Sequence, residues 1–548
     1  MLPRTKPGTT RSRGITGRFK LALCCSVLLF YPACSRINVD CATGDPSCSP
    51  FAWLLSLSGR NLNPRPCAGI GLDLASFHSY VSSGLNLQGA NVCALKEGGM
   101  VALGRTPTGT TLQGKAPLIA HSGATSDTMV VKWDSSGNLI WFTYLGTGVS
   151  DLEFEKLAET SDGGLVLLGG MSGPDNFVIG GVSPILPATS GDDSDIYLLR
   201  LRADGSVAWH TALSGSGSGD ESDNGGVVVA DDGTIYISGT AGQNALNTIG
   251  GVTATVPNPG DGSDIVFAKF SDAGTLLSFR YIGGGGSGLI SYYGLSLVKT
   301  SDGNFVIGGD AYGPPANTID GKTAILPYTA GDDRENMAVK VDPNGNLLWF
   351  TYLGGGGASN IYNHSAISSL SDGSVVLGAY TSTGVNTIGG IGALLPRSNS
   401  DALVFKLSPS GQLQWFTYVG GPGSYYNLYD VREAADGGIL FGGTAQNGAA
   451  TIGGVNERAP CGAVANCAFL GRLGTSGGVE WFTHAASGGG TSYYSLSAIN
   501  ATAEGGVIGI GYAQDAGATI QGKSPLNPFQ VGDSYDLFLV KIDPQGNL

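Results

Sequence analysis

The sequence NLLWFTYLGGGG, residues 346–357, decides the fold, because near-copies of it recur along almost the whole chain. Neighbouring copies start 64 to 71 residues apart, and a fixed period of this kind marks a repeat architecture. Some copies depart from WFTY, namely at Ser278, at His210, at His484 and over the whole first copy. We expect a less regular structure at these places. The seven copies start at Phe77, Trp141, Trp209, Ser278, Trp349, Trp415 and Trp481.

Three further landmarks follow each other in constant order between the copies. The first is an acidic-Gly turn such as Asp302-Gly303, which between two apolar runs predicts a tight hairpin. The second is a Thr-Ile-x-Gly element such as residues 318–321, and the third is an apolar strand with a basic residue such as Lys340. One unit therefore holds four strands, A to D, where A and B flank the acidic-Gly turn and D carries WFTY. Seven such units predict an all-β, seven-bladed β-propeller of four-stranded blades.

The two ends of the repeat region supply an independent indication of this fold. Residues 77–81 are a lone strand D, whereas the segment from Asp536 is a strand C and its turn. The N-terminal strand is therefore predicted to complete the last blade, which closes the ring and removes free sheet edges. The 90 glycines and the 13% charged residues agree with an all-β chain that has many turns.

The first 33 residues are predicted to be a signal peptide, because basic residues without any acidic one precede the apolar run LALCCSVLLFY. This run is too short to span a bilayer. Cys34 follows Pro-Ala and resembles the lipidated cysteine of a bacterial lipobox, although Tyr31 stands where such boxes usually have Leu. An ordinary signal peptide remains the alternative. We expect a leader at 1–33, a lipid-anchored tether at 34–66 and the propeller at 67–548, held at the bacterial outer membrane or cell surface.

Charge and cysteine content fit an exported protein. The net charge of −14 falls to −20 without the six basic residues of the leader, which excludes nucleic acid as an expected partner. Six cysteines remain beyond the leader and Cys34, and an even number in an exported chain favours disulfides. A metal site is the weaker alternative, because neither close pair has CxxC spacing. By proximity the expected pairs are Cys41 with Cys48, Cys67 with Cys93, and Cys461 with Cys467, although the sequence does not fix the connectivity.

The repeat pattern D-x-x-x-x-K-x-D-x-x-G-x-L-x-W-F-T-Y-L-G-G resembles the bacterial β-propeller repeat called SBBP, over about residues 70–548. The resemblance implies an exported or surface protein with a propeller fold. It implies no single activity, because fold does not give function.

The topology predicts where a ligand binds. The A–B and C–D turns are tight and lie on one face, while the B–C loops and the D-to-A crossings lie on the other, where binding is expected. The crossings are rich in tyrosine, whose flat ring and hydroxyl suit sugar rings or protein partners. Packing between blades is the alternative for any one tyrosine, but at least one of each adjacent pair should point away from the core. The predicted ligand-binding residues are Tyr292, Tyr293, Tyr362, His364, Tyr425, Tyr426, Tyr429, Tyr493 and Tyr494.

Metal and catalytic motifs are weak. The B–C loops hold acidic clusters that suit calcium, but none has the D-x-[DN]-x-[DN]-G pattern, and hydrogen bonding within turns explains them as well. These calcium candidates are Asp192, Asp193, Asp332 and Asp333. The sequence contains no G-x-S-x-G and no HExxH motif. We therefore predict no enzymatic activity and no required cofactor, and a lipid-anchored protein that binds a glycan or an extracellular protein. The alternatives are a propeller glycoside hydrolase or lyase acting on polysaccharide, and a structural envelope lipoprotein without a specific ligand.

Overall fold

The computed structural model describes residues 77–548, apart from 82–87, 110, 124–125, 149–150, 173–176, 189–194, 214–221, 261, 285–289, 330–333, 356–359, 399, 463, 465, 487–491, 515–518 and 527–534. Residues Asn63–Leu548 form one compact unit. The predicted leader, the lipidation candidate Cys34 and the tether lie outside the described residues.

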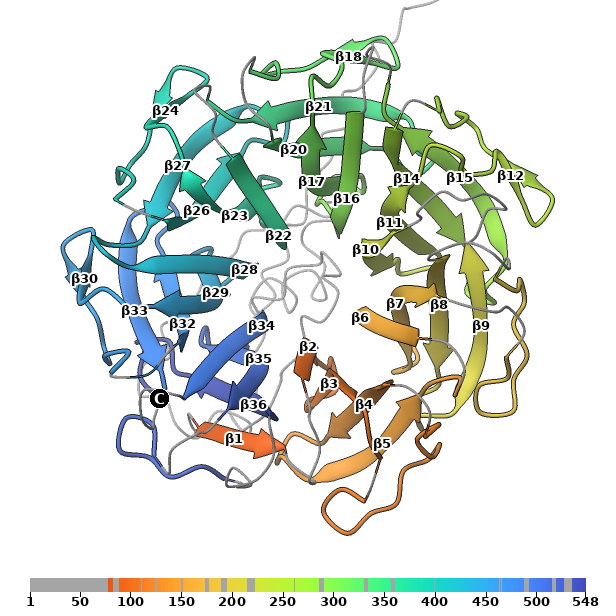
Figure 1. The fold of residues 1–548 in the computed structure, drawn as a ribbon, viewed down its shortest axis with the longest axis horizontal. Coiled ribbons are helices and arrows are strands. Elements are labelled where there is room, and N and C mark those ends of the chain that lie inside the picture. The colour runs from red at the N-terminus through yellow and green to blue at the C-terminus, as the bar shows by residue number, and fades with distance from the viewer. Residues whose placement is uncertain are drawn as a thin grey trace, which may run out of the picture. The chain divides into compact units, whose positions relative to one another are not determined.

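Seven four-stranded antiparallel sheets form the blades of a β-propeller, which confirms the predicted fold (Figure 1). No helix occurs in the described part of the chain. The inner strands A of blades one to seven are β2 (Gln88–Ala94), β6 (Asp151–Glu159), β10 (Ser222–Val229), β16 (Ile290–Lys299), β22 (Asn360–Ser369), β28 (Tyr425–Glu433) and β34 (Tyr493–Ala501). The strands B are β3 (Met100–Thr106), β7 (Leu165–Ser172), β11 (Ile235–Ala241), β17 (Phe305–Tyr312), β23 (Val375–Thr383), β29 (Ile439–Gln446) and β35 (Val507–Gln514).

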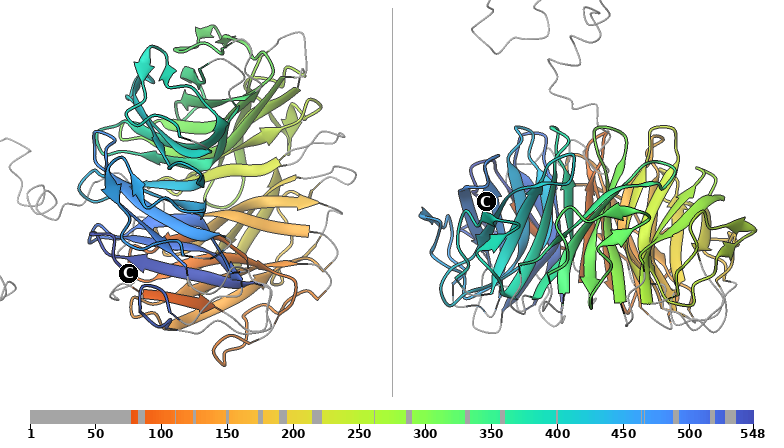
Figure 2. Two further views of the ribbon diagram at one scale, coloured as in Figure 1. Left: turned by 60° about the vertical axis from the view of Figure 1, so that its left-hand side comes forward. Right: turned by 90° about the horizontal axis from the view of Figure 1, so that it is seen from above.

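The outer half of each blade consists of strands C and D. The strands C are β4 (Asp127–Trp133), β8 (Asp195–Leu201), β14 (Gly262–Phe270), β20 (Arg334–Val341), β26 (Asp401–Leu407), β32 (Cys467–Leu473) and β36 (Asp536–Ile542). The strands D are β5 (Leu139–Leu145), β9 (Val207–Leu213), β15 (Leu276–Ile282), β21 (Leu347–Leu353), β27 (Leu413–Val419), β33 (Val479–Ala485) and β1 (Phe77–Val81). In the side view of Figure 2 the strands run between two faces, one with the A–B and C–D turns and one with the longer connections.

The ring closes as predicted, because β1 is the outer strand of the seventh blade. It pairs antiparallel with β36, from Phe77 opposite Lys541 to Val81 opposite Leu537. The apolar core is divided into seven clusters, each of which lies mainly between two neighbouring blades. The propeller is therefore stabilised by the contacts of each blade with the next rather than by one central core.

The B–C loops turn outward and cover the outer strands instead of lying over the loop-rich face. In blade four the Ile325 N–H donates to the Phe350 carbonyl (3.0 Å), and the Tyr352 N–H donates to the Leu326 carbonyl (3.1 Å). Strand D would otherwise present an unpaired edge, which proteins avoid. The Thr-Ile-x-Gly elements form small hairpins at the outer rim (Figure 1): β12 (Thr248–Ile249) with β13 (Val252–Thr253), β18 (Thr318–Ile319) with β19 (Lys322–Thr323), β24 (Thr387–Ile388) with β25 (Ile391–Gly392), and β30 (Thr451–Ile452) with β31 (Val455–Asn456).

In blades one, two and four, the tryptophan of WFTY connects the blade to the next one. The Trp349 indole N–H donates to the Pro409 carbonyl in the C–D turn of blade five (3.1 Å). Gly411 in that turn has a φ of +83°, and a Cβ there would lie 2.7 Å from the Trp349 ring. Glycine is thus required both for the turn and for the close approach of the ring.

Blade three lacks this tryptophan, and an arginine takes its place. Ser278 stands at the tryptophan position, and Arg280, two residues further on the same side of the strand, donates to the Gly345 carbonyl of the next turn (2.8 Å). Arg280 also pairs with Asp320. Blade three, where the sequence predicted a less regular edge, therefore contacts blade four through an arginine instead of a tryptophan.

On the tight-turn face, the acidic-Gly turn and the basic residue of strand C form one repeated ion pair. In blade four the Lys340 ammonium lies 2.7 Å from Asp302. Because both landmarks belong to the same blade, this pair joins the A–B hairpin to strand C. The other pairs are Asp162 with Arg200, Asp372 with Lys406, Asp436 with Arg472, and Glu504 with Lys541.

The last glycine of WFTYLG is explained by a buried acid at the start of strand C. In blade five Asp401 accepts a hydrogen bond from the Ser398 N–H (2.6 Å) and so anchors the B–C loop. A Cβ on Gly420 would lie 2.0 Å from this carboxylate. A Cβ would lie equally close to the buried acid in three other blades, on Gly146 to Asp127, on Gly283 to Asp264 and on Gly354 to Glu335.

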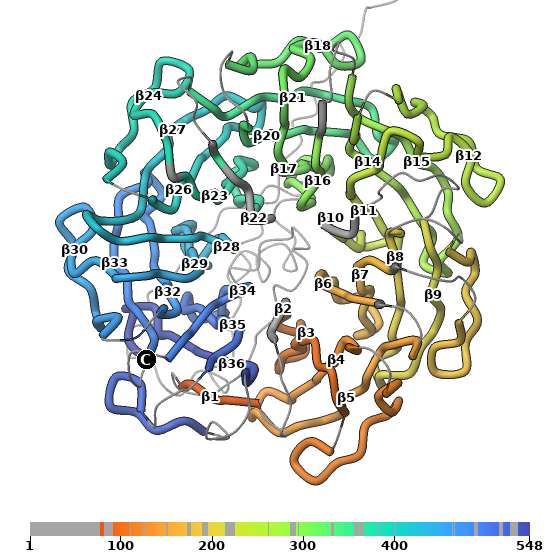
Figure 3. The backbone as a smooth tube through the Cα atoms, in the orientation of Figure 1, coloured from red at the N-terminus to blue at the C-terminus, as the bar shows by residue number. Residues whose placement is uncertain are grey.

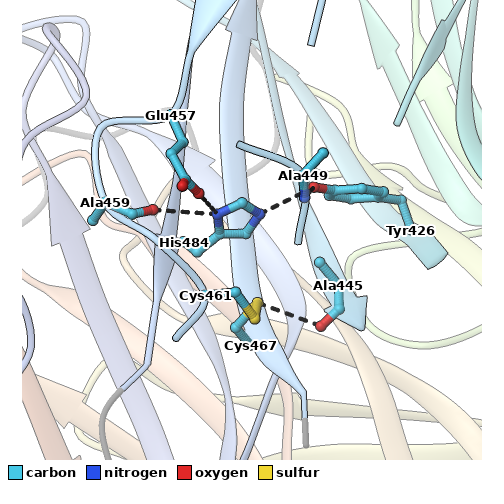
Figure 4. Close-up of a disulfide and its surroundings, with 8 residues drawn as sticks. All are labelled: Tyr426, Ala445, Ala449, Glu457, Ala459, Cys461, Cys467 and His484. Carbon is cyan, nitrogen blue, oxygen red and sulfur yellow. Dashed lines mark hydrogen bonds and ion pairs between the residues drawn. A yellow bond between two sulfur atoms is a disulfide. The ribbon is translucent and has the colours of Figure 1, made fainter. Parts of the chain in front are cut away.

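Blade six replaces this acid with a disulfide, which confirms the predicted pairing of Cys461 with Cys467 (Figure 4). Cys467 occupies the position of Asp401, and Cys461 lies in the B–C loop, so a covalent bond anchors the loop. Ala486 stands where blades one, three, four and five have the last glycine, and no carboxylate crowds this position. Cys461, Cys467 and Ala486 therefore belong together: the disulfide replaces the buried acid, and the alanine replaces the glycine that the acid requires.

His484 belongs to the same anchor and is a buried structural residue. Its Nε2 lies 3.2 Å from the Tyr426 hydroxyl, and its Nδ1 lies 3.0 Å from Glu457 and 3.2 Å from the Ala459 carbonyl (Figure 4). Burial lowers the pKa of His484 to about 4, so the ring is neutral at physiological pH. In blade five the tyrosine at this position, Tyr418, donates instead to the Val385 carbonyl (2.7 Å).

Candidate functional site

The inner strands deviate from regular pairing close to the propeller axis. All seven contain a register shift, and in β28 it lies between Leu428, opposite Gly443, and Asp430, opposite Gly442. Bulges of this kind change the direction of a side chain and are frequent next to active sites. The inner strands begin on the loop-rich face, so the axial end of this face is the candidate site.

Three of the predicted ligand-binding tyrosines are buried. Tyr292, Tyr426 and Tyr494 are exposed by 1%, 0% and 0%, and their hydroxyls are used inside the fold. Tyr426 accepts a hydrogen bond from the Ala449 N–H (2.6 Å), and the Tyr494 hydroxyl lies 3.1 Å from that of Tyr80. Packing between strands and loops, the alternative considered from the sequence, applies to these three rings, and they do not reach a ligand.

The other predicted tyrosines with described side chains reach the surface. Tyr425 is 47% exposed, and Tyr293, Tyr429 and Tyr493 are half-buried. In the pairs 425/426 and 493/494, one ring points inward and the other outward, as strand geometry requires. Tyr362 and His364 lie on β22, but their side chains are outside the described part of the structure.

Strand B supplies three tyrosines that the sequence did not indicate. Tyr312, Tyr380 and Tyr512 lie near the ends of β17, β23 and β35 and are half-buried. Tyr312 packs edge-on against Tyr293 (ring centroids 5.5 Å apart), and Tyr512 stacks on Tyr493 (5.6 Å). We call the six residues Tyr293, Tyr312, Tyr380, Tyr429, Tyr493 and Tyr512 the tyrosine arc, because they follow one another around the axis on blades four to seven.

The hydroxyls of the arc influence one another. Burial raises the pKa of Tyr429, and the neighbouring hydroxyls of Tyr493 and Tyr380 raise it further. Burial and a hydrogen bond with Tyr493 likewise raise the pKa of Tyr512. These phenols therefore stay protonated over the whole physiological range, so each can donate a hydrogen bond while its ring offers an apolar surface.

An arginine holds the blade-four end of the arc in place. The Arg334 guanidinium lies 4.6 Å from the centre of the Tyr312 ring, and its Nε donates to Asp310 (2.9 Å). Asn336 donates to the other oxygen of Asp310 (3.1 Å). Stacking of a guanidinium on an aromatic face is favourable, so the ring of Tyr312 is fixed before any ligand arrives.

The opposite half of the axial ring has a different chemistry. The described parts of β2, β3, β6, β7 and β10 contain no tyrosine. There Arg105 of blade one forms an ion pair with Glu153 of blade two (2.7 Å). A repeated scaffold thus carries aromatic residues on one half of its axial surface and a charged pair on the other.

The predicted calcium residues Asp192, Asp193, Asp332 and Asp333 all lie outside the described residues. Within the described ranges, no group of three or more His, Cys, Asp or Glu is arranged to hold a metal ion. Of the other cysteines, Cys93 is in a disulfide whose partner is not among the described residues, and Cys34, Cys41, Cys48 and Cys67 are not described. No helix of the described part is long and apolar enough to cross a membrane.

Similarity to known proteins is limited to solved structures. No protein-family model and no curated protein matches the chain. Among solved structures, an ulvan lyase is similar over 88% of this chain and 95% of its own (11% identity, TM-score 0.40). A sialidase from Streptococcus pneumoniae is similar over 86% and 70% (10% identity, TM-score 0.37), and an α-L-arabinofuranosidase from Fusarium graminearum over 67% and 92% (10% identity, TM-score 0.35).

These likenesses concern the fold alone, but they correct one prediction. The chain was predicted to have no enzymatic activity, because it lacks short catalytic motifs. The similar solved structures include polysaccharide lyases and a sialidase, so the prediction is withdrawn: the lack of short motifs does not show that a propeller is a non-enzyme. The physical reason is that a propeller brings together side chains from several blades, and these have no fixed spacing in the sequence.

Proposed function

We propose that this protein is a polysaccharide-cleaving β-propeller that holds its substrate on the tyrosine arc. The observation that carries the proposal is the gathering of six partly exposed tyrosines from four consecutive blades at the axial end of one face. Sugar rings have an apolar side that stacks on aromatic rings and a rim of hydroxyls that bonds to polar groups, and tyrosine offers both.

Tyr429 is the residue that we place at the bond to be cleaved. It lies at the bulge in β28, between the arc residues of blades five and seven. Because burial raises its pKa, the hydroxyl stays protonated and can donate a hydrogen bond to the oxygen of the cleaved linkage. Asp310 and Glu153, which lie on either half of the axial ring, are each paired with an arginine, so we assign them no part in the chemistry.

The test is a screen of the full chain against alginate, pectate, chondroitin sulfate, hyaluronan, xylan, arabinan and starch. We expect at least one polymer to be shortened, with new reducing ends and a fall in viscosity. The mass of the products shows the reaction type, because hydrolysis adds water to each cleaved bond and elimination leaves an unsaturated sugar instead. If the protein shortens none of these polymers, the proposed function fails.

We also propose, from the leader and Cys34, that the propeller is lipid-anchored at the surface of a bacterium and belongs with SBBP-repeat proteins. A polymer too large to enter the cell is accessible at this location. Incorporation of a palmitate analogue into the wild-type chain, and its loss in Cys34→Ala, is the expected result. Equal labelling of both chains would reject the anchor.

A further inference from the structure

Two pairs of tyrosines in the arc have the geometry of sugar-binding platforms. In blade four, Tyr293 on β16 packs against Tyr312 on β17 with ring centroids 5.5 Å apart. In blade seven, Tyr493 on β34 stacks on Tyr512 on β35 at 5.6 Å with the planes 7° apart. Each pair joins neighbouring strands of one sheet, so each platform moves as part of a rigid blade.

Each platform is also supported by a further residue of its own blade. Arg334 stacks on Tyr312 at 4.6 Å and is fixed by Asp310. Tyr535, which directly precedes β36, packs edge-on against Tyr512 at 5.3 Å. Rings that are held in place before binding lose little conformational freedom when a ligand arrives, and this favours affinity.

The two platforms lie on well-separated parts of the ring. The inner strands β16 and β34 approach the axis from different sides, with β22 and β28 between them (Figure 3). The intervening blades contribute Tyr380 and Tyr429 to the same face. A ligand that follows the arc from one platform to the other therefore extends past Tyr380 and Tyr429.

We infer that one polysaccharide chain occupies both platforms at once, so that the protein cleaves within the chain and not at its ends. A site that removes terminal sugars needs contacts on one side of the cleaved bond and a block on the other. Here aromatic surface lies on both sides of Tyr429. The cleavage mode rests on the proposed function, whereas the occupation of both platforms does not.

The experiment is chemical footprinting of the full chain with N-acetylimidazole, which acetylates accessible tyrosines, in the presence of each polysaccharide of the panel. We expect one polymer to protect Tyr293, Tyr312, Tyr493 and Tyr512 together, as measured by peptide mass spectrometry. The buried Tyr426 and Tyr494 are internal controls and should stay unmodified with or without polymer. Early products from that polymer should be fragments of many lengths.

Two variants sharpen the result. Tyr312→Ala and Tyr512→Ala should each weaken polymer binding about fivefold, while the platform of the other blade remains protected at saturating polymer. Protection of a single platform, or products that are single terminal sugars, overturns the inference even if cleavage occurs. Protection of both platforms without any cleavage contradicts the proposed function alone. Absence of protection with every polymer overturns the inference.

Discussion

The two faces of the propeller differ in what the repeats conserve. On the tight-turn face, the same ion pair between the A–B turn and strand C recurs in five blades. At the axial end of the loop-rich face, blades four to seven present tyrosines, whereas blades one and two present the Arg105–Glu153 pair. Features that recur in each repeat maintain the scaffold, and features that differ between blades are candidates for function. Each of the following predictions tests this division.

The largest expected effect is on activity. Replacing both Tyr493 and Tyr512 with Ala removes the blade-seven platform, and we expect kcat/KM for the cleaved polymer to fall about 100-fold. The melting temperature should change little, because both side chains are partly exposed. Steady-state kinetics beside thermal unfolding checks this. An unchanged kcat/KM would show that blade seven does not bind the substrate.

The second effect concerns the loop anchors of blades five and six. Gly420→Ala places a Cβ against Asp401 and should destabilise the fold by about 2 kcal/mol. The reverse exchange in blade six, Ala486→Gly, should cost less than about 1 kcal/mol, because no carboxylate lies there. Denaturant unfolding of both variants measures the difference.

A double variant tests the same explanation. Asp401→Ala removes the group that crowds position 420, so the cost of Gly420→Ala should be smaller in that background. Equal costs in both backgrounds would show that the carboxylate is not the reason for the glycine.

The third prediction is a loss of stability in mild acid to which His78 contributes. This residue lies buried on β1, and neither ring nitrogen has a hydrogen-bond partner in the part of the chain that the structure describes. Burial, helped by the charge of Lys523, lowers its pKa to about 4. The unfolded chain binds a proton near pH 6.5, so the free energy of unfolding should decrease by about 3 kcal/mol as the pH falls from 6.5 to 4.

The matched variant for this prediction is His78→Phe, because phenylalanine occupies this position in the WFTY copies. It should retain the fold and lose about 3 kcal/mol of the pH dependence between 6.5 and 4, while the part that comes from His484, whose pKa burial also lowers to about 4, remains. A second loss is expected at lower pH, where carboxylates with lowered pKa such as Asp436, bonded to Arg472, become protonated. If His78→Phe unfolds in acid like the wild type over the upper range, His78 is not the cause.

The smallest effect is expected on the tight-turn face. Lys340→Met removes one of the repeated ion pairs, whose acid Asp302 is 48% exposed. Exposed pairs contribute little, so the loss should be below about 1 kcal/mol. Activity should stay at the wild-type level, and a marked loss of activity would mean that the tight-turn face takes part in function.

The sequence predicted the blades and their closure because these depend on local periodicity and on turns that glycine allows. It could not separate buried from exposed tyrosines in the same way. The pairing places Tyr292 opposite Ala311 and Tyr426 opposite Ala445, so Tyr292, the first of its adjacent pair, corresponds to Tyr426, the second of its pair. Both lie ten residues before the acid of the next acidic-Gly turn. Alternation within a pair shows that one ring faces the core but not which one.

The three arc tyrosines on strands B, Tyr312, Tyr380 and Tyr512, were not predicted from the sequence for a related reason. Tyr312 and Tyr512 become part of the surface through their cross-strand neighbours Tyr293 and Tyr493, and such pairs require a known register. Tyrosines at the ends of the strands after the acidic-Gly turns were the available signal. The prediction that there is no enzymatic activity failed because it relied on short motifs, which a site built from several blades does not need.

The most direct test compares the two halves of the axial ring. Tyr429→Phe removes one hydroxyl from the arc, while Arg105→Met removes the cation from the charged half. On the polymer that the wild type cleaves best, we expect Tyr429→Phe to lose at least about 100-fold in kcat and Arg105→Met to stay within about threefold. A Tyr429→Phe variant with wild-type kcat, or a greater loss in Arg105→Met, would contradict the assignment of the site to the tyrosine arc.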